Sequence, residues 1–403
     1  MRVYLQAWRT PGAKPFVVAG FIARFPGAMG GVALMLMING FYGEYTTAGL
    51  VTAVATVATA VCAPIVGRLI DRHGQRRIGY PLIAVFTLGS VGLTAAAWLR
   101  APWPLLVPFA LVVGASSFPI GALTRSRWSH LLPESPLLQP AFSLESMLDD
   151  VAFILAPTIA TVAATLVWPG VGLLPAAGVA IVVVLLLGAG SFFLSRRASE
   201  PAVGDRRRKG SAIRVSGVAL ISVVFVGVGV QFGSNNITMV AMCESLGHKA
   251  LSGPIMACGS AASMVGALFY GSRPWRMPLW KRFVVGMFAL AGAALLFLLA
   301  YTWWSLIVVS FISGLAVSPT FINGNSLIER IVPAQNLTEG LTWIGTALGV
   351  GIAAGSSLSG RVVDAFGAHS GYWVMAAGAV AAMLIALASG RLLSRHPALA
   401  DRR

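Results

Sequence analysis

Long apolar runs alternate with short polar stretches along most of the chain. Twelve of these runs have the roughly 20 mostly apolar residues that one membrane-spanning helix needs. They lie at residues 16–39, 46–70, 78–98, 103–124, 141–167, 170–194, 214–238, 250–271, 283–302, 304–326, 339–361 and 371–392. The first run is too long for the core of a signal peptide, which has about 7 to 15 apolar residues. The pattern therefore predicts an all-α integral membrane protein with twelve transmembrane helices.

One polar stretch, residues 195–213, is longer than the others and rich in arginine. It separates residues 1–194 from residues 214–403, and each part contains six of the predicted helices. The two parts also echo each other, because "AGLV" (48–51) and Gly67 recur, with the same separation, as "SGPI" (252–255) and Gly271. Internal repeats of this kind are typical of transporter folds. We therefore predict two pseudo-symmetric six-helix bundles joined by a basic cytoplasmic linker at 195–213.

Composition supports a membrane protein and explains the high net charge. Only 10% of the 403 residues are charged and 57% are hydrophobic, whereas soluble domains are about 25% charged. The net charge of +16 could indicate nucleic-acid binding. However, 25 of the 29 lysines and arginines fall on one side if the N-terminus is cytoplasmic, which is the positive-inside pattern. We expect a multi-pass monomer in the lipid bilayer, with both termini cytoplasmic and no nucleic-acid partner.

Sequence motifs of metal sites and of enzymes are missing. The three cysteines, Cys62, Cys243 and Cys258, form no CxxC pair. The sequence contains no HExxH, no GxSxG and no GxxxxGK[ST] motif. We therefore expect no metal, no cofactor, no enzymatic activity and no direct use of ATP.

The loop after the second predicted helix reads "GRLIDRHGQRR", residues 67–77. At this position it resembles the signature loop of the major facilitator superfamily, and the twelve helices and the 6+6 division fit that family over essentially the whole chain. The resemblance implies the facilitator fold in a bacterial inner membrane, alternating access and, usually, proton coupling. It also implies a conformational gate formed by Gly67, Asp71, Arg72, Gly74, Arg76 and Arg77. We expect Gly67 to let helices approach closely and Gly74 to permit the tight turn between the second and third helices. The alternative is that these arginines only anchor the topology.

A second group of ionisable residues falls inside the predicted helices. Arg24 lies well within the first helix, where a charge is costly and usually faces a cavity or a partner. Asp149 lies at about the same depth in the fifth helix, which also contains Glu145 and Asp150. We predict that Arg24, Glu145, Asp149 and Asp150 include the proton-coupling site. The alternatives are a structural ion pair or acids that reach the cytoplasmic interface.

Polar amides in the seventh and tenth predicted helices are the candidates for substrate contacts, because lipid does not accept them. The resemblance implies that these helices line the central cavity, and the candidates are Gln231, Asn235, Asn236, Asn323 and Asn325. Amides also join helices by hydrogen bonds, which is the alternative interpretation. The glycines of the eleventh helix, with a hinge as the alternative, indicate close helix packing; they are Gly345, Gly349, Gly351, Gly355 and Gly360.

These features predict a secondary transporter that exports a small amphipathic metabolite or drug in exchange for protons. The stretch "ILAPTIAT" (154–161) matches only in part the fifth-helix motif of drug antiporters in the family. A proton-coupled importer therefore stays open as an alternative. So does a membrane-embedded binding or scaffold protein that keeps the fold without transport.

Overall fold

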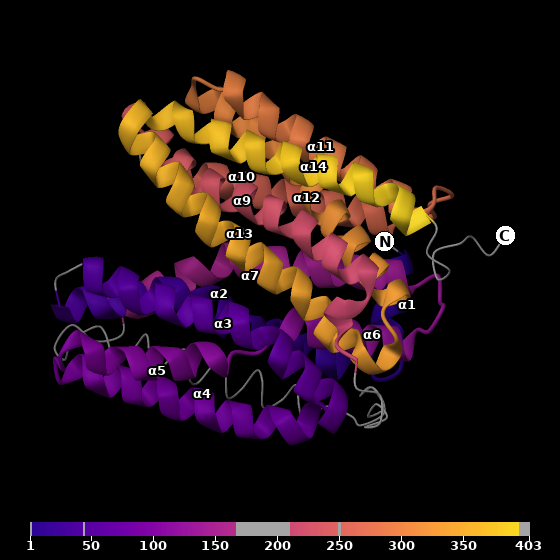
Figure 1. The fold of residues 1–403 in the computed structure, drawn as a ribbon, viewed down its shortest axis with the longest axis horizontal. Coiled ribbons are helices and arrows are strands. Elements are labelled where there is room, and N and C mark those ends of the chain that lie inside the picture. The colour runs from indigo at the N-terminus through magenta and orange to yellow at the C-terminus, as the bar shows by residue number, and fades with distance from the viewer. Residues whose placement is uncertain (1, 43–44, 167–209, 249–250, 395–403) are drawn as a thin grey trace. The chain divides into compact units, whose positions relative to one another are not determined.

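The computed structural model describes residues 2–42, 45–166, 210–248 and 251–394. These ranges are nearly all helical and contain no strand. The α-helices are α1 (Arg2–Arg9), α2 (Ala13–Tyr42), α3 (Tyr45–His73), α4 (Gln75–Trp98), α5 (Trp103–Ala115), α6 (Ile120–Leu131), α7 (Leu138–Leu166), α9 (Ser216–Ser245), α10 (Ser252–Gly271), α11 (Leu279–Leu296), α12 (Trp303–Ile331), α13 (Leu337–Phe366) and α14 (Gly371–Ser394) (Figure 1).

The helices confirm the predicted fold class. Within the described ranges, nine helical segments are long and apolar enough to cross a membrane. Each predicted run except 170–194 coincides with an observed helix. That run and most of the predicted linker, 195–213, lie outside the described residues, so the division of the chain at the linker stays a prediction.

The fourth predicted span, 103–124, differs from the prediction in two ways. It is interrupted between α5 and α6, where Pro119 has no N–H group to continue the helix and Phe118 before it is disfavoured in the α conformation. The helix then continues to Leu131. Arg125 and Arg127 follow the predicted span 103–124, where a cytoplasmic loop is expected, but both lie inside α6.

The chain packs as two compact units. Unit 1 contains Met1–Tyr4, Ser135–Asp150 and Lys209–Arg403, and unit 2 contains Leu5–Glu134 and Val151–Arg208. The first part of α7 thus packs with the C-terminal half of the sequence, although it belongs to the N-terminal half.

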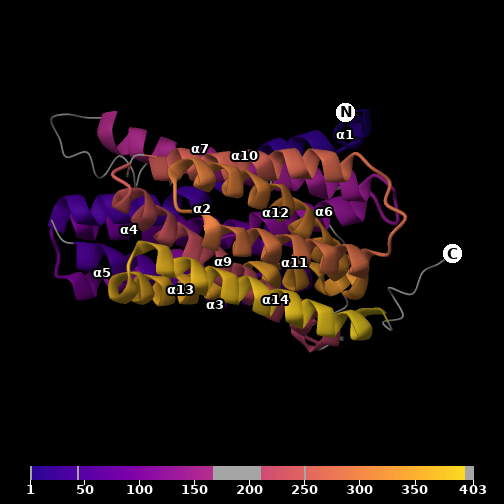
Figure 2. The same cartoon turned by 90° about the horizontal axis from the view of Figure 1, so that it is seen from above.

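Glycine positions set the closest helix approaches in unit 1. A Cβ atom at Gly351 or Gly355 of α13 would overlap the backbone of α9. This confirms the predicted close packing for these two glycines, and α13 lies against α9 in both views (Figures 1 and 2). The prediction is wrong for the other three glycines of this helix, because a Cβ atom there would meet nothing within 4 Å; these are Gly345, Gly349 and Gly360. Small residues at such contacts are how membrane helices gain packing energy without a hydrophobic driving force.

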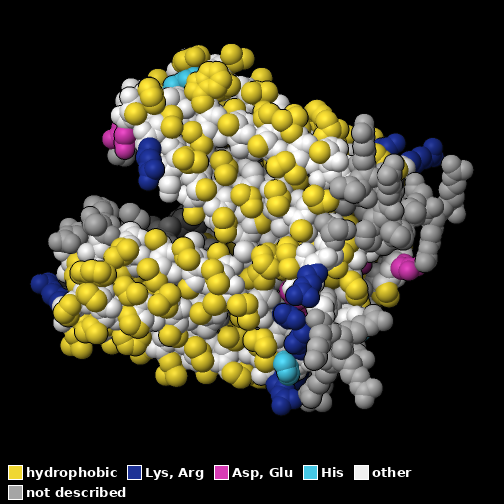
Figure 3. Space-filling model, viewed as in Figure 1, with side chains coloured by type: hydrophobic (Ala, Val, Ile, Leu, Met, Phe, Trp, Pro, Cys, Tyr) yellow, Lys and Arg dark blue, Asp and Glu magenta, His cyan; other side chains and the backbone are white. Residues whose placement is uncertain are grey.

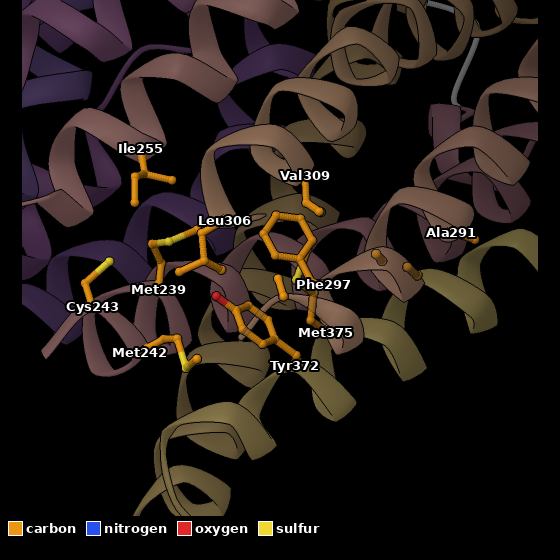
Figure 4. Packing of buried hydrophobic residues seen from close by; sticks show 13 residues of the cluster. Met239, Met242, Cys243, Ile255, Ala291, Phe297, Leu306, Val309, Tyr372 and Met375 are labelled. Carbon is orange, nitrogen blue, oxygen red and sulfur yellow. The ribbon is translucent and has the colours of Figure 1, made fainter. Parts of the chain in front are cut away.

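A cluster of buried apolar side chains fills the interior of unit 1. It joins five helices, α9, α10, α11, α12 and α14, and includes Met239, Met242, Phe297 and Tyr372 (Figure 4). The Phe297 and Tyr372 rings lie 5.2 Å apart between centroids.

Further apolar side chains cover the outer faces of the helices (Figure 3). Among them, Val61 and Leu88 are 61% and 71% exposed. Such faces suit contact with lipid.

Candidate functional site

The signature loop forms a tight connection between α3 and α4. Gly74 is the single residue between these helices and has a φ of 88°, a conformation that favours glycine. Gly67 is buried inside α3. The Asp71, Arg72 and Arg76 side chains are half-buried, and that of Arg77 is exposed. The predicted role of Gly74 in the turn is confirmed, while the gate role of the charged residues stays a prediction.

Arg127 of α6 contacts the residue that follows the signature loop turn, although the sequence predicts it in a loop after the fourth span. Its side chain has no exposed surface, and its Nε donates a hydrogen bond to Oε1 of Gln75 at 2.7 Å. The guanidinium also lies 5.8 Å from the centroid of the Phe16 ring. Arg127 therefore ties the first residue of α4 to α6. The buried, polar partner explains why the helix continues through this position instead of ending at a solvated loop.

Arg24 is buried inside α2, as predicted, and is 7% exposed. Its Nη2 donates to Thr124 Oγ1 of α6 at 3.2 Å. This contact lies within unit 2, whereas Glu145, Asp149 and Asp150 belong to unit 1. The predicted pairing of Arg24 with the fifth-helix acids stays a prediction.

The acids of α7 do not all face solvent. Glu145 has no exposed surface, and Asp149 and Asp150 are half-buried. Asp150 accepts a hydrogen bond from Ser318 of α12, at 3.0 Å between Ser318 Oγ and Asp150 Oδ2. Glu145 is therefore enclosed by protein, and both the coupling role and the interfacial alternative for these acids stay predictions.

The amides of α9 lie in different surroundings. Gln231 is 3% exposed, and its Oε1 has no hydrogen-bond partner among the described residues. It shares a helical stripe with Val228 and Met242, so its side of α9 is the one that packs into the interior of unit 1. Asn235 is half-buried and Asn236 is exposed. All three stay candidates for substrate contacts.

Asn323 of α12 belongs to a hydrogen-bond network at the Gly271 end of α10. It accepts a hydrogen bond from the Tyr270 hydroxyl, which in turn accepts one from Nη1 of Arg282 at 3.1 Å. The same Nη1 lies 3.0 Å from Gln139 Oε1, and Gln139 Nε2 donates to the Tyr270 carbonyl at 3.2 Å. The network joins α7 to α10, α11 and α12. Asn325 instead donates to Phe321 within its own helix, at 2.8 Å.

Gly271 allows α7 and α1 to come close to α10. A Cβ atom at this position would overlap the Ser143 hydroxyl and lie 2.6 Å from the Tyr4 hydroxyl. Tyr4 donates to the carbonyl of Leu268 at 2.6 Å. Burial raises the pKa of Tyr4 to about 12, so this hydroxyl stays a neutral donor at physiological pH. Gly271 is the repeat copy of Gly67, and its missing side chain leaves room for Ser143 and Tyr4.

Groups that could hold a metal ion are not assembled in the described part of the chain, where no three His, Cys, Asp or Glu side chains come together. The three cysteines lie in these ranges as free thiols.

Comparisons with known proteins agree with this fold. The family model of the Major Facilitator Superfamily matches residues 16–300 and 276–401. No curated protein matches the chain.

Solved transporters share the arrangement at low sequence identity. A bacterial homologue of the iron transporter ferroportin, in an outward-facing state, has a TM-score of 0.76 at 11% identity over 94% of this chain and 98% of its own. The human organic anion transporter MFSD10 has a TM-score of 0.71 at 12% identity over 93% of this chain and 100% of its own. The E. coli fucose:proton symporter FucP has a TM-score of 0.71 at 15% identity over 94% and 98%.

The identities are too low to transfer substrates, but the family match spans most of the chain. The nearly all-helical fold and the membrane-spanning helices agree with that match. The protein is thus a multi-pass membrane transporter and belongs to the major facilitator superfamily.

Proposed function

We propose that the protein is a proton-coupled secondary transporter that exports a small amphipathic metabolite or drug by alternating access. In this proposal the membrane is the bacterial inner membrane, with both termini in the cytoplasm, and the protein works as a monomer. The charge distribution along the loops supports the orientation. The fucose:proton symporter shows that proton coupling occurs on this fold.

The observation that supports proton coupling is the set of ionisable side chains buried in apolar helices. Arg24 and Glu145 are 7% and 0% exposed, respectively, in α2 and α7. Charges at such positions are expensive, and in membrane proteins they commonly mark proton or substrate pathways. A carboxylate that exchanges its proton as the helices move would link the pH gradient to substrate movement.

The fifth-helix acids are tested by removing one ionisable group at a time. Asp149→Asn keeps the shape of the side chain but cannot ionise, so we expect uphill, pH-driven flux to be abolished while downhill substrate exchange persists. The measurement is uptake into everted vesicles with and without an imposed pH gradient. Full uphill transport by this variant would exclude Asp149 as a coupling residue, and flux in the opposite direction would favour the importer.

The signature loop is tested through conformational exchange. Asp71→Asn removes the charge that the neighbouring arginines can bind, and a hydrogen bond to a charged group contributes about 1.5–3 kcal/mol. We therefore expect the rate of exchange between inward and outward accessibility to change by roughly tenfold or more. Accessibility of single-cysteine probes on both membrane sides measures it. Unchanged kinetics would leave these arginines with a topological role only.

A further inference from the structure

Three side chains form a chain of hydrogen bonds from α10 through α12 to α7. Ser263 Oγ donates to Ser318 Oγ at 2.9 Å, and Ser318 Oγ donates to Asp150 Oδ2 at 3.0 Å. Ser263 and Ser318 are buried, with 2% and 3% exposure. Ser318 of the C-terminal half thus donates directly to a carboxylate of the N-terminal half, and Ser263 donates to Ser318.

Small residues bring α10 and α12 close enough for this contact. A Cβ atom at Gly266 of α10 would overlap the backbone of α12, and one at Gly314 of α12 would overlap the carbonyl of Gly259. Ser263 lies between Gly259 and Gly266 on the same helix face, and Ser318 lies one turn after Gly314. The two helices run side by side in Figures 1 and 2. Their packing therefore fixes Ser318 in place for Asp150.

The partners lie at similar depths in the helices. Asp150 is about 18 Å along α7 from Leu138, and Ser318 is about 20 Å along α12 from Ile331, at 1.5 Å per residue. The apolar layer of a bilayer is about 30 Å thick. We expect a contact this far from both helix ends to fall within that layer, where water competes less for hydrogen bonds.

On α7, one stripe faces the C-terminal half. Gln139 bonds to Tyr270, Ser143 lies against Gly271, and Asp150 bonds to Ser318. Ser146 falls on the same stripe and is 4% exposed. Alternating access requires the two halves of the sequence to move against each other, so this stripe is where α7 must separate from its partners.

The strength of the hydrogen bonds between Ser263, Ser318 and Asp150 depends on the charge of Asp150. A serine hydroxyl has one proton, so Ser318 can donate to a carboxylate while it accepts from Ser263. Such a hydrogen bond to an ionised acceptor is roughly twice as strong as one between neutral groups. When a proton binds to Asp150, the anion becomes a neutral acid and the contact with Ser318 weakens.

We propose that Asp150, Ser318 and Ser263 form a protonation-sensitive contact that holds the start of α7 to the C-terminal half, with Ser318 as the positioning residue. Proton binding to Asp150 favours release of α7, and return of α7 favours release of the proton. The inference rests on the proposed proton coupling. It identifies Asp150 as the fifth-helix acid whose protonation changes the contact with the C-terminal half.

Few other ionisable groups face this contact from the described elements of unit 1. Glu145 and Asp149 lie on α7 itself, while α10 has no charged side chain. Glu329 and Arg330 of α12 lie about 17 Å or more along the helix from Ser318. Arg282 bonds to Gln139, about 17 Å along α7 from Asp150. The predicted partner of Asp149 in the N-terminal half is Arg24.

A double-mutant cycle tests the proposal without a known substrate. The background protein has its native cysteines replaced and carries Ser146→Cys, and the probe is N-ethylmaleimide at pH 8 and pH 6. Each rate is divided by that of the same cysteine in the unfolded protein at the same pH. We compare the background with Asp150→Asn, Ser318→Ala and the double variant, and use Ser310→Ala of α12 and Ser260→Ala of α10 as matched controls.

The expected results follow from the loss of the charged hydrogen bond. At pH 8, Asp150→Asn should react about tenfold faster than the background, and it should react equally fast at pH 6, whereas the background rate should rise as the pH is lowered. Ser318→Ala should raise the pH 8 rate up to about tenfold, and the double variant should match Asp150→Asn, because the two residues act on one contact. Both control variants should behave as the background.

Two results would overturn the proposal. One is reactivity of Ser318→Ala equal to the background at both pH values, and the other is a full additional effect of Ser318→Ala in the Asp150→Asn protein. Flux assays separate this inference from the proposed function. If transport is driven by the pH gradient but the double-mutant cycle shows no coupling between Asp150 and Ser318, only the proposed contact is wrong. If the cycle shows the coupling but the pH gradient drives no transport, the proposed function is wrong.

Discussion

Replacing Gly271 with alanine is expected to release the start of α7 from α10 and to raise the reactivity of the Ser146→Cys probe by about five- to 150-fold. The added Cβ would overlap the Ser143 hydroxyl and come within 2.6 Å of that of Tyr4. Overpacking of this kind costs about 1–3 kcal/mol, which corresponds to that change in an equilibrium. The measurement is the rate of maleimide labelling in purified protein.

Gly253→Ala is the matched control for this experiment. Gly253 lies on the same helix, α10, and a Cβ atom there would meet nothing within 4 Å. We expect the control to label at the background rate. Equal labelling of the Gly271→Ala protein and the background would show that the packing of α7 on α10 does not depend on the missing side chain.

Replacing Arg127 with methionine is expected to lower the free energy of unfolding by about 2 kcal/mol. The variant loses a charge-assisted hydrogen bond and leaves Gln75 Oε1 buried without its donor, and each effect is typically about 1–3 kcal/mol. Relief from burying the guanidinium offsets part of this loss. Thermal unfolding in detergent measures the difference as a midpoint lowered by several degrees.

Arg77→Met serves as the control, because Arg77 lies in the same loop region but is exposed. Surface substitutions of this kind usually change stability by less than about 0.5 kcal/mol. Arg127→Lys keeps the charge and a donor, so it should recover part of the stability. An Arg127→Met protein as stable as the background would mean that the bond to Gln75 contributes nothing net.

Apolar periodicity and loop charge were sufficient to predict the helices, because lipid imposes a length and a composition on each span. The turn at Gly74 was also predictable, since a tight connection between helices favours glycine. The end of the fourth span was not. Arg127 lies beyond the apolar run that defined the fourth span, and its buried contacts with Gln75 and Phe16 come from residues far away in the sequence.

The sequence did not predict the tertiary contacts of the fifth helix. Asp150 was predicted as an ionisable candidate from its position in an apolar run. Its partner, Ser318, is 168 residues away and lies on a helix with many small residues. No local pattern distinguishes Ser318 from the other serines of α12. The repeat of Gly67 at Gly271 predicted two equivalent halves but not the proximity of Gly271 to Ser143, because a repeat does not show which helices pack together.

The central claim, that a pH gradient drives export, is tested most directly by uptake into everted vesicles. Vesicles with an acidic interior are supplied with a panel of small amphipathic metabolites and drugs, with and without a protonophore. The account predicts that at least one compound accumulates only when the protein and the gradient are both present. Accumulation that is independent of the gradient for every compound would contradict it.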